Sequence, residues 1–127
     1  MNIAYLAAPH THPDPKIKEL RHELVNRTAY RLISQGIMVY SPLTHNIPLD
    51  ALGIHGDWLT WKDFDLEMLS RCDRLIVLKL PGWEVSKGVA AEIAHAKELG
   101  LPIEWLEEEE VMVSLFSSCS DSSSLDA

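Results

Sequence analysis

A serine, a glycine and a glutamate stand at the spacing Ser86-x-Gly88-x-x-x-Glu92, just after the apolar run RLIVLKL. Ser86 is a good helix N-cap, and its hydroxyl and the next backbone amides can hold an anion at the start of a helix. Gly88 lies four residues before Glu92, hence on the same helical face, and its missing Cβ leaves room for a ligand to reach the carboxylate. The plainer alternative is a capping serine, a packing glycine and a solvated surface glutamate.

A second carboxylate near Glu92 would narrow the range of reactions that the site could catalyse. Asp65 lies in the segment WKDFDLEML, ahead of the apolar run, but Asp57, Asp63 and Glu67 compete with it, and spacing alone does not choose between them. Two carboxylates in one cleft repel each other, so that one of them takes a raised pKa. Such a pair suits cleavage of a glycosidic bond, in which one carboxylate attacks or stabilises an oxocarbenium-like sugar.

Aromatic residues flank these positions. Tyr5 lies inside an apolar segment, where it either packs in the core with a satisfied hydroxyl or orients a carboxylate by a hydrogen bond. Trp58, Trp61 and Trp83 lie near the expected site loops. They are candidates for stacking on a base or lining an apolar pocket, and ordinary core or interface packing is the alternative for each.

Histidines invite a metal hypothesis. His10 and His12 form His-x-His, with His45 and His55 available from a second loop, but no spacing of Asp, Glu or Cys completes a zinc set. We therefore expect no metal site. His10, His12 and His45 are candidates for contacting a phosphate or a base instead.

Three common catalytic motifs are missing from the sequence. It has no Gly-x-Gly-x-x-Gly after the first strand, no Walker-type Gly-Lys-Ser/Thr and no Gly-x-Ser-x-Gly elbow. Their absence disfavours hydride transfer, nucleoside triphosphate hydrolysis and an ordinary α/β-hydrolase.

Hydrophobic periodicity predicts alternating strands and helices. The expected strands are 2–8, 37–42, 73–80 and 101–106, the expected helices are 16–35, 57–71 and 87–99, and the expected loops include 9–15 and 43–56. This order predicts a three-layer α/β domain of the flavodoxin or Rossmann kind, with four or five mainly parallel strands. Ligands bind such sheets beyond the carboxyl ends of the strands, where strand order reverses.

The length of the chain and the distribution of its charges predict one domain followed by a tail. Its 127 residues suit one domain, expected at 1–106, followed by an acidic and Ser-rich tail at 107–127 in which VMVSLF could be a strand or a helix. The net charge of −8 is concentrated after residue 103, because residues 1–103 hold 12 acidic and 11 basic side chains. With no basic stripe, polymeric nucleic acid is not an expected partner.

Composition also bears on location. No apolar stretch approaches the roughly 20 residues that span a bilayer, so no membrane partner is expected. The N-terminus lacks a basic leader, and the only two cysteines, Cys72 and Cys119, have no metal-type spacing. We expect a cytoplasmic protein in a reducing compartment.

Three segments resemble the nucleoside 2-deoxyribosyltransferase-like superfamily, which includes nucleotide N-glycosidases. They are YLAAP at 5–9, DLEMLSRCDRLIVL at 65–78 and PGWEVSKGVAAEIAHAKELGLPI at 81–103. The closest likeness is to a small branch that carries PGWExSxG and an SPLTH loop. The resemblance runs over most of residues 1–106 and does not extend to the tail.

The resemblance implies roles for individual residues. Glu92 matches the glutamate nucleophile that attacks the anomeric carbon, Asp65 the aspartate that assists at the leaving base or the sugar, and Tyr5 the tyrosine that orients the glutamate. Ser86 and Gly88 match the segment that receives the 5′-phosphate or 5′-hydroxyl. It further implies cleavage of the N-glycosidic bond of a nucleoside or nucleoside 5′-monophosphate without a cofactor, in a homodimer or larger homo-oligomer.

The first loop departs from the related glycosidases. APHTHPDP at 8–15 replaces their Gly- or Ser-rich loop, unless His10, Thr11 or His12 takes its place. This departure keeps open a second hypothesis, a non-catalytic nucleotide-binding or sensor module that uses the same pocket. The remaining candidates for contacting substrate are Pro9, His10, His45, Trp61 and Trp83.

Overall fold

The computed structural model describes residues 2–107. The predicted tail beyond residue 107, with Cys119, lies outside the described residues. Strands and helices alternate in the order β1 (Ile3–Ala7), α1 (Pro15–Ser34), β2 (Met38–Tyr40), α2 (Pro42–Leu49), α3 (Trp58–Ser70), β3 (Arg74–Lys79), α4 (Lys87–Leu99) and β4 (Ile103–Glu107). A π-helical segment, Asp50–Ile54, follows α2, and a 3-10 turn, Trp83–Val85, precedes α4. None of the helices in residues 2–107 has the length and apolar character needed to cross a membrane.

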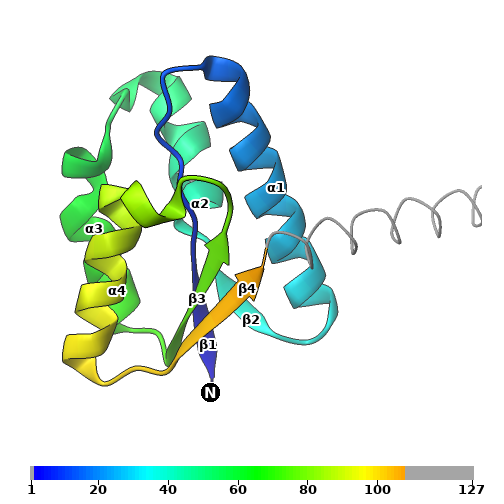
Figure 1. Ribbon diagram of the computed structural model, residues 1–127, viewed down its shortest axis with the longest axis vertical. Coiled ribbons are helices and arrows are strands. Elements are labelled where there is room, and N and C mark those ends of the chain that lie inside the picture. The colour runs from blue at the N-terminus through cyan, green and yellow to red at the C-terminus, as the bar shows by residue number, and fades with distance from the viewer. Residues whose placement is uncertain (1, 108–127) are drawn as a thin grey trace, which may run out of the picture.

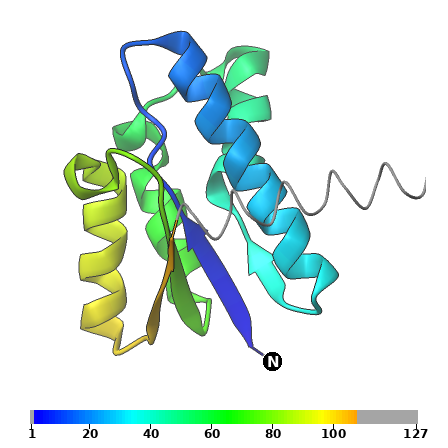
Figure 2. The same cartoon turned by 45° about the vertical axis from the view of Figure 1, so that its right-hand side comes forward.

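The strands form one four-stranded sheet in the order β2-β1-β3-β4, and every pair is parallel. The predicted α/β class and parallel sheet are therefore confirmed, and the architecture is flavodoxin-like. Figures 1 and 2 show α1 on one face of the sheet and α3 and α4 on the other. The chain leaves β1 in one direction to form β2 and later in the other to form β3, so the order reverses between β1 and β3, where such folds bind ligands.

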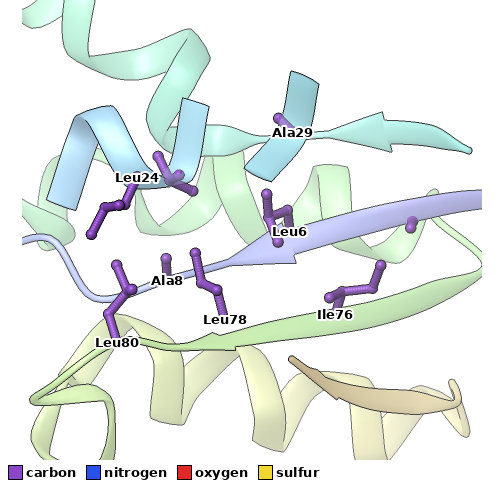
Figure 3. Packing of buried hydrophobic residues seen from close by; sticks show 9 residues of the cluster. Leu6, Ala8, Leu24, Ala29, Ile76, Leu78 and Leu80 are labelled. Carbon is purple, nitrogen blue, oxygen red and sulfur yellow. The ribbon is translucent and has the colours of Figure 1, made fainter. Parts of the chain in front are cut away.

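Alternation along the strands divides the core into two layers. Ala4 and Leu6 face α1, where they pack with Leu24 and Ala29 (Figure 3). The intervening residue Tyr5 points to the opposite face, into a cluster that includes Leu69 of α3 and Val89 of α4. Because successive side chains in a strand point to opposite faces, Tyr5 must face the layer that contains α3 and α4.

Helix boundaries follow the capping signals in the sequence. The Asp57 side chain accepts a hydrogen bond from the amide of Thr60, and the Ser86 hydroxyl accepts one from the amide of Val89 at 3.2 Å. At the other end of α4, Gly100 adopts a φ of 72°, a left-handed conformation that glycine tolerates best. These caps fix where α3 and α4 begin, and so fix the positions of Asp65 and Glu92 along them.

Residues 43–56, predicted as a loop, are largely helical, and that prediction is wrong. Pro42 occupies the first turn of α2, where proline is tolerated because its nitrogen needs no hydrogen-bond partner. Pro48 lies inside the same helix. Leu43 packs on the core layer beside α1 and the Asn46 side chain is buried. Tertiary packing thus outweighs the local signals of proline and glycine.

The helical spacing of Leu20, Leu24, Val25, Ala29 and Ile33 predicts a buried apolar face for α1, and the structure matches this prediction only in part. Leu24, Val25 and Ala29 are buried as expected, but Leu20 and Ile33 are about half exposed, at 50% and 56%. Arg21 and Thr28 take buried positions instead. A polar pair on the buried face of α1 needs hydrogen-bond partners, and Thr28 finds one in the carbonyl of Leu24 at 2.7 Å.

Arg21 joins two loops at the carboxyl edge of the sheet. Its guanidinium donates to the carbonyl of Thr11 at 2.9 Å, in the loop after β1, and to the carbonyl of Pro81 at 2.6 Å, in the loop after β3. Gly82, with a φ of 94°, lies so close that an added Cβ would stand 2.6 Å from Nη2 of Arg21. Arg21 and Gly82 therefore fix the relative positions of the two loops.

We expect Gly82→Ala to lower the free energy of unfolding by more than Gly36→Ala, as measured by urea denaturation. Gly36 has a similar φ, 88°, but its added Cβ would meet nothing within 4 Å, so its variant reports backbone strain alone, about 1–2 kcal/mol. The excess for Gly82 measures displacement of the Arg21 guanidinium. Equal effects of the two substitutions would show that Arg21 does not hold the loop tightly.

Candidate active site

Tyr5 and Glu92 meet between the sheet and α4. The Tyr5 hydroxyl donates a hydrogen bond to Oε2 of Glu92. Tyr5 is fully buried and Glu92 is only 4% exposed. Glu92 is therefore not the solvated surface charge that the alternative interpretation required.

Enclosure changes the acidity of both groups. The pKa of Glu92 is raised to about 8, chiefly by burial; the hydrogen bond from Tyr5 opposes this rise and the nearby charge of Asp65 adds to it. Burial likewise raises the pKa of Tyr5 well above its ordinary value, and the charges of Glu92 and Asp65 add to it. A carboxyl group with a pKa near neutrality can exchange its proton at physiological pH, which is typical of catalytic acids and nucleophiles.

Asp65 is the second carboxylate of this cluster. It is 5% exposed, while its competitors Asp63 and Glu67 are exposed and Asp57 caps α3. Both oxygens of Asp65 accept from the side-chain amide of Asn46, at 3.0 and 3.2 Å. Burial raises the pKa of Asp65, and Asn46 and then His45 oppose this rise.

Several aromatic rings lie near Tyr5 on the side of the site that α2 and α3 form. Tyr40 lies 5.8 Å from Tyr5 between ring centroids, and His45 stacks on Phe64 at 5.3 Å. Trp61 meets the His45 ring edge-on at 6.1 Å, and its indole N–H donates to Asp50 at 2.9 Å. His45 and Trp61, which were both predicted to contact the substrate, thus pack against each other next to the site.

The space that Gly88 leaves by lacking a Cβ is filled by an aromatic ring of the protein itself. A Cβ at Gly88 would stand 3.3 Å from Cε3 of Trp58, so the indole lies against the glycine. The expectation that a ligand passes over Gly88 to Glu92 therefore requires Trp58 to move. Tyr5, Asp65 and Glu92 are all buried, whereas the sequence predicted that they line a cleft open to substrate.

The other predicted contacts lie elsewhere. Pro9 is buried in the core, and His10 lines a hollow of about 550 Å³ together with Lys18, His22 and His55. Trp83 packs against Trp105 at 5.5 Å between ring centroids. None of these residues is recorded in contact with Glu92. The hollow that contains His10 is instead placed at the carboxyl end of β1, between α1 and the segment after α2.

Metal chemistry has no support in the described part of the chain. Across residues 2–107, no group of three or more His, Cys, Asp or Glu side chains is arranged to hold a metal ion.

Sequence reasoning overlooked Asn46, Tyr40 and Arg21. Asn46 lies in the polar stretch THN, for which the sequence predicts a loop, and a loop pattern does not indicate where a side chain points. Arg21 falls four residues after Ile17 and three before Leu24, on the buried face of α1, and this helical spacing was a usable signal. Tyr40 ends β2 in register with Tyr5 of β1, which only strand pairing reveals.

An all-parallel α/β sheet with a buried phenol–carboxylate pair on the face that α3 and α4 cover makes this a flavodoxin-like domain with a buried polar site. Residues 2–108 match the family model described as a domain of unknown function, DUF1937, and the chain belongs to that family. No curated protein matches the sequence.

Proposed function

We propose that the chain cleaves the N-glycosidic bond of a nucleoside or nucleoside 5′-monophosphate, as a hydrolase or a deoxyribosyltransferase, with Glu92 as the nucleophile. The observation that carries this proposal is the hydrogen bond from Tyr5 to a buried Glu92, next to a second buried carboxylate, Asp65. The likeness of these positions to the nucleoside 2-deoxyribosyltransferase-like superfamily supports the same reaction.

In the proposed reaction, an oxygen of Glu92 attacks the anomeric carbon. The bond between that carbon and the base nitrogen breaks, and its electron pair leaves with the base, which takes up a proton. Water, or a second base, then releases the sugar from the Glu92 ester. Tyr5 orients the glutamate, and Asp65 contacts the sugar or the leaving base.

Glu92 attacks only in its ionised form. Because its pKa is about 8, a fraction of the protein carries the nucleophilic carboxylate at neutral pH, and kcat/KM should rise as the pH increases toward 8. The hydrogen bond from Tyr5 favours the ionised form, so Tyr5→Phe should move this rise to higher pH.

In this proposal the substrate's 5′ end binds at the start of α4. The backbone amides of the first turn of a helix have no partners within the helix, and they attract negative charge. Ser86 caps this turn, and Glu92 follows one to two turns further along the same helix. Once Trp58 moves away from Gly88, a sugar bound between these points would have its anomeric carbon near the carboxylate.

Chromatography of a panel of nucleosides and nucleoside 5′-monophosphates after incubation with the protein tests the proposal. Free base should form with at least one member of the panel and should not form with Glu92→Gln. If no member of the panel yields free base at high protein concentration, the proposal that the chain cleaves N-glycosidic bonds is refuted.

A second candidate function is a nucleotide-binding or sensor module without turnover, which the departure of the first loop, APHTHPDP at 8–15, from the related glycosidases favours. A sensor should show saturable thermal stabilisation by a nucleotide, and this stabilisation should survive Glu92→Gln. Absence of stabilisation by every nucleotide tested would remove this candidate.

A further inference from the structure

Three side chains form a hydrogen-bonded relay from the surface of α2 to the candidate site. His45 is exposed, and its Nδ1 lies 2.7 Å from Oδ1 of the neighbouring Asn46. Asn46 is only 3% exposed, and its amide nitrogen Nδ2 donates to both oxygens of Asp65, at 3.0 and 3.2 Å. A single amide group therefore connects the buried carboxylate to an exposed imidazole.

Asp65 determines which way the amide group of Asn46 faces. A carboxylate only accepts hydrogen bonds, and an amide oxygen turned toward it at 3.0 Å would be repelled. An ionised Asp65 therefore requires the amide nitrogen to face it, and the amide oxygen then faces His45. Because an amide oxygen has no proton to donate, the proton of this second bond must be on Nδ1 of His45.

Ring packing keeps His45 in the orientation that this bond needs. The imidazole stacks on Phe64, with 5.3 Å between ring centroids and 10° between ring planes, and it meets Trp61 edge-on at 6.1 Å. If the imidazole were turned over, a C–H group would lie where Nδ1 is. Such groups approach oxygen only to about 3.3–3.6 Å, so the 2.7 Å contact with Asn46 requires a nitrogen donor.

We propose that Asp65, acting through Asn46, holds His45 in the Nδ1–H tautomer, so that Nε2 of the neutral ring accepts a hydrogen bond from an N–H group of the ligand. In a neutral imidazole one nitrogen donates and the other accepts, and the bond made by the first sets the state of the second. Within residues 2–107, Nε2 of His45 has no recorded partner, so no group in the described part of the chain uses this acceptor. Asn46 is a positioning residue, and His45 selects ligands that carry an N–H donor.

A nucleobase carries the donor that this acceptor would select. Proteins recognise unpaired bases by hydrogen bonds to the edge that pairs in a duplex, which bears amide N–H or amino groups, and by stacking on the flat ring. His45 and Phe64 supply an acceptor and aromatic surface side by side, next to the carboxylates. This selection of the base rests on the proposed function, but the tautomer of His45 does not.

Two-dimensional proton–nitrogen NMR of the histidine rings tests the tautomer, in buffer alkaline enough for imidazole to be neutral. The signals of His45 are assigned from His45→Gln, and they should show a protonated Nδ1 and an unprotonated Nε2. His12 is an internal reference, because its Nδ1 accepts from the amide of Asp14 at 2.9 Å and its proton must therefore be on Nε2. If His45 showed the same pattern as His12, the inference would be overturned.

A substitution that leaves His45 itself unchanged tests the relay. Asp65→Leu removes the acceptors that orient the Asn46 amide, so a measurable share of His45 should change to the Nε2–H tautomer. The matched control is Asp63→Leu, the same change at an exposed position of α3, which should leave the tautomer of His45 as it was. Should Asp65→Leu fail to fold, Asn46→Ala removes the amide itself and should have the same effect. An unchanged tautomer in the folded variant would show that Asp65 does not act on His45.

The selection of the base is tested with His45→Phe, which keeps a flat ring but lacks the acceptor. Its kcat/KM for base release should fall about tenfold for a nucleoside whose base carries the N–H group, as expected for one lost hydrogen bond. It should not change for the analogue in which that nitrogen is methylated. Equal falls for the two substrates would show that His45 only packs against the base, and would refute the selection.

Failure of this inference is distinguishable from failure of the proposed function. If the tautomer of His45 depends on Asp65 while no nucleoside releases a base, the relay stands and the glycosidase falls. If base release depends on Glu92 while His45 carries its proton on Nε2, the glycosidase stands and the relay falls.

Discussion

Glu92→Gln abolishes release of free base, with an expected drop in kcat of about a thousandfold or more, because the amide cannot form the covalent bond to the sugar. The fold should survive, since the glutamine oxygen can still accept the hydrogen bond that Tyr5 donates to Glu92. The measurement is chromatography of free base over time with the best member of the nucleotide panel. Circular dichroism verifies that the variant is folded.

Glu98→Gln is the matched control for this prediction. It makes the same chemical change on the same helix, α4, but the side chain of Glu98 is 77% exposed. Its kcat should equal that of the unaltered protein. If Glu92→Gln retained full activity, Glu92 would not be the nucleophile, and the proposed mechanism would have to be abandoned.

The second large effect is on stability as a function of pH. Burial raises the pKa of Glu92 from 4.5 to about 8 in the folded protein. Below pH 4.5 the carboxyl group is protonated in both states. Between 4.5 and about 8 the unfolded chain loses the proton that the folded protein keeps, so the free energy of unfolding falls as the pH rises, and above about 8 the loss is complete.

The size of this effect on the free energy of unfolding follows from the size of the pKa shift of Glu92. A change of about 3.5 units corresponds to on the order of 5 kcal/mol between the two ends of the window. Glutamine does not titrate, so the free energy of unfolding of Glu92→Gln, relative to the unaltered protein, should increase from pH 4.5 to 8. Urea denaturation at several pH values measures the difference between the two proteins, in which contributions from other groups cancel.

A pH-independent difference would contradict this expectation. It would mean that Glu92 is hydrated and ionised at neutral pH, and that its enclosure in this structure opens readily. The same experiment on Glu98→Gln should show no trend, because that side chain lies in solvent.

Local signals in the sequence predicted most of the order and the ends of the helices and strands. Alternating apolar runs and helical stripes predicted the parallel sheet, and Asp57, Ser86 and Gly100 marked the ends of α3 and α4 correctly. These are effects of neighbouring residues on the backbone, so they can be read without knowing what packs where. The exception was 43–56, where packing of Leu43 and burial of Asn46 make a helix from a stretch that contains one proline and two glycines.

The tertiary structure decided which polar groups meet. Asp57, Asp63, Asp65 and Glu67 are equivalent in spacing, and only packing of α3 on the sheet buries Asp65 and turns it toward Asn46. Closure of the site by Trp58 over Gly88 also depends on contacts between residues 30 positions apart. The sequence by itself determined the order and the ends of the elements, because these depend on near neighbours. Enclosure, and with it the raised pKa of Glu92, arises only when α3, α4 and the sheet exclude water together.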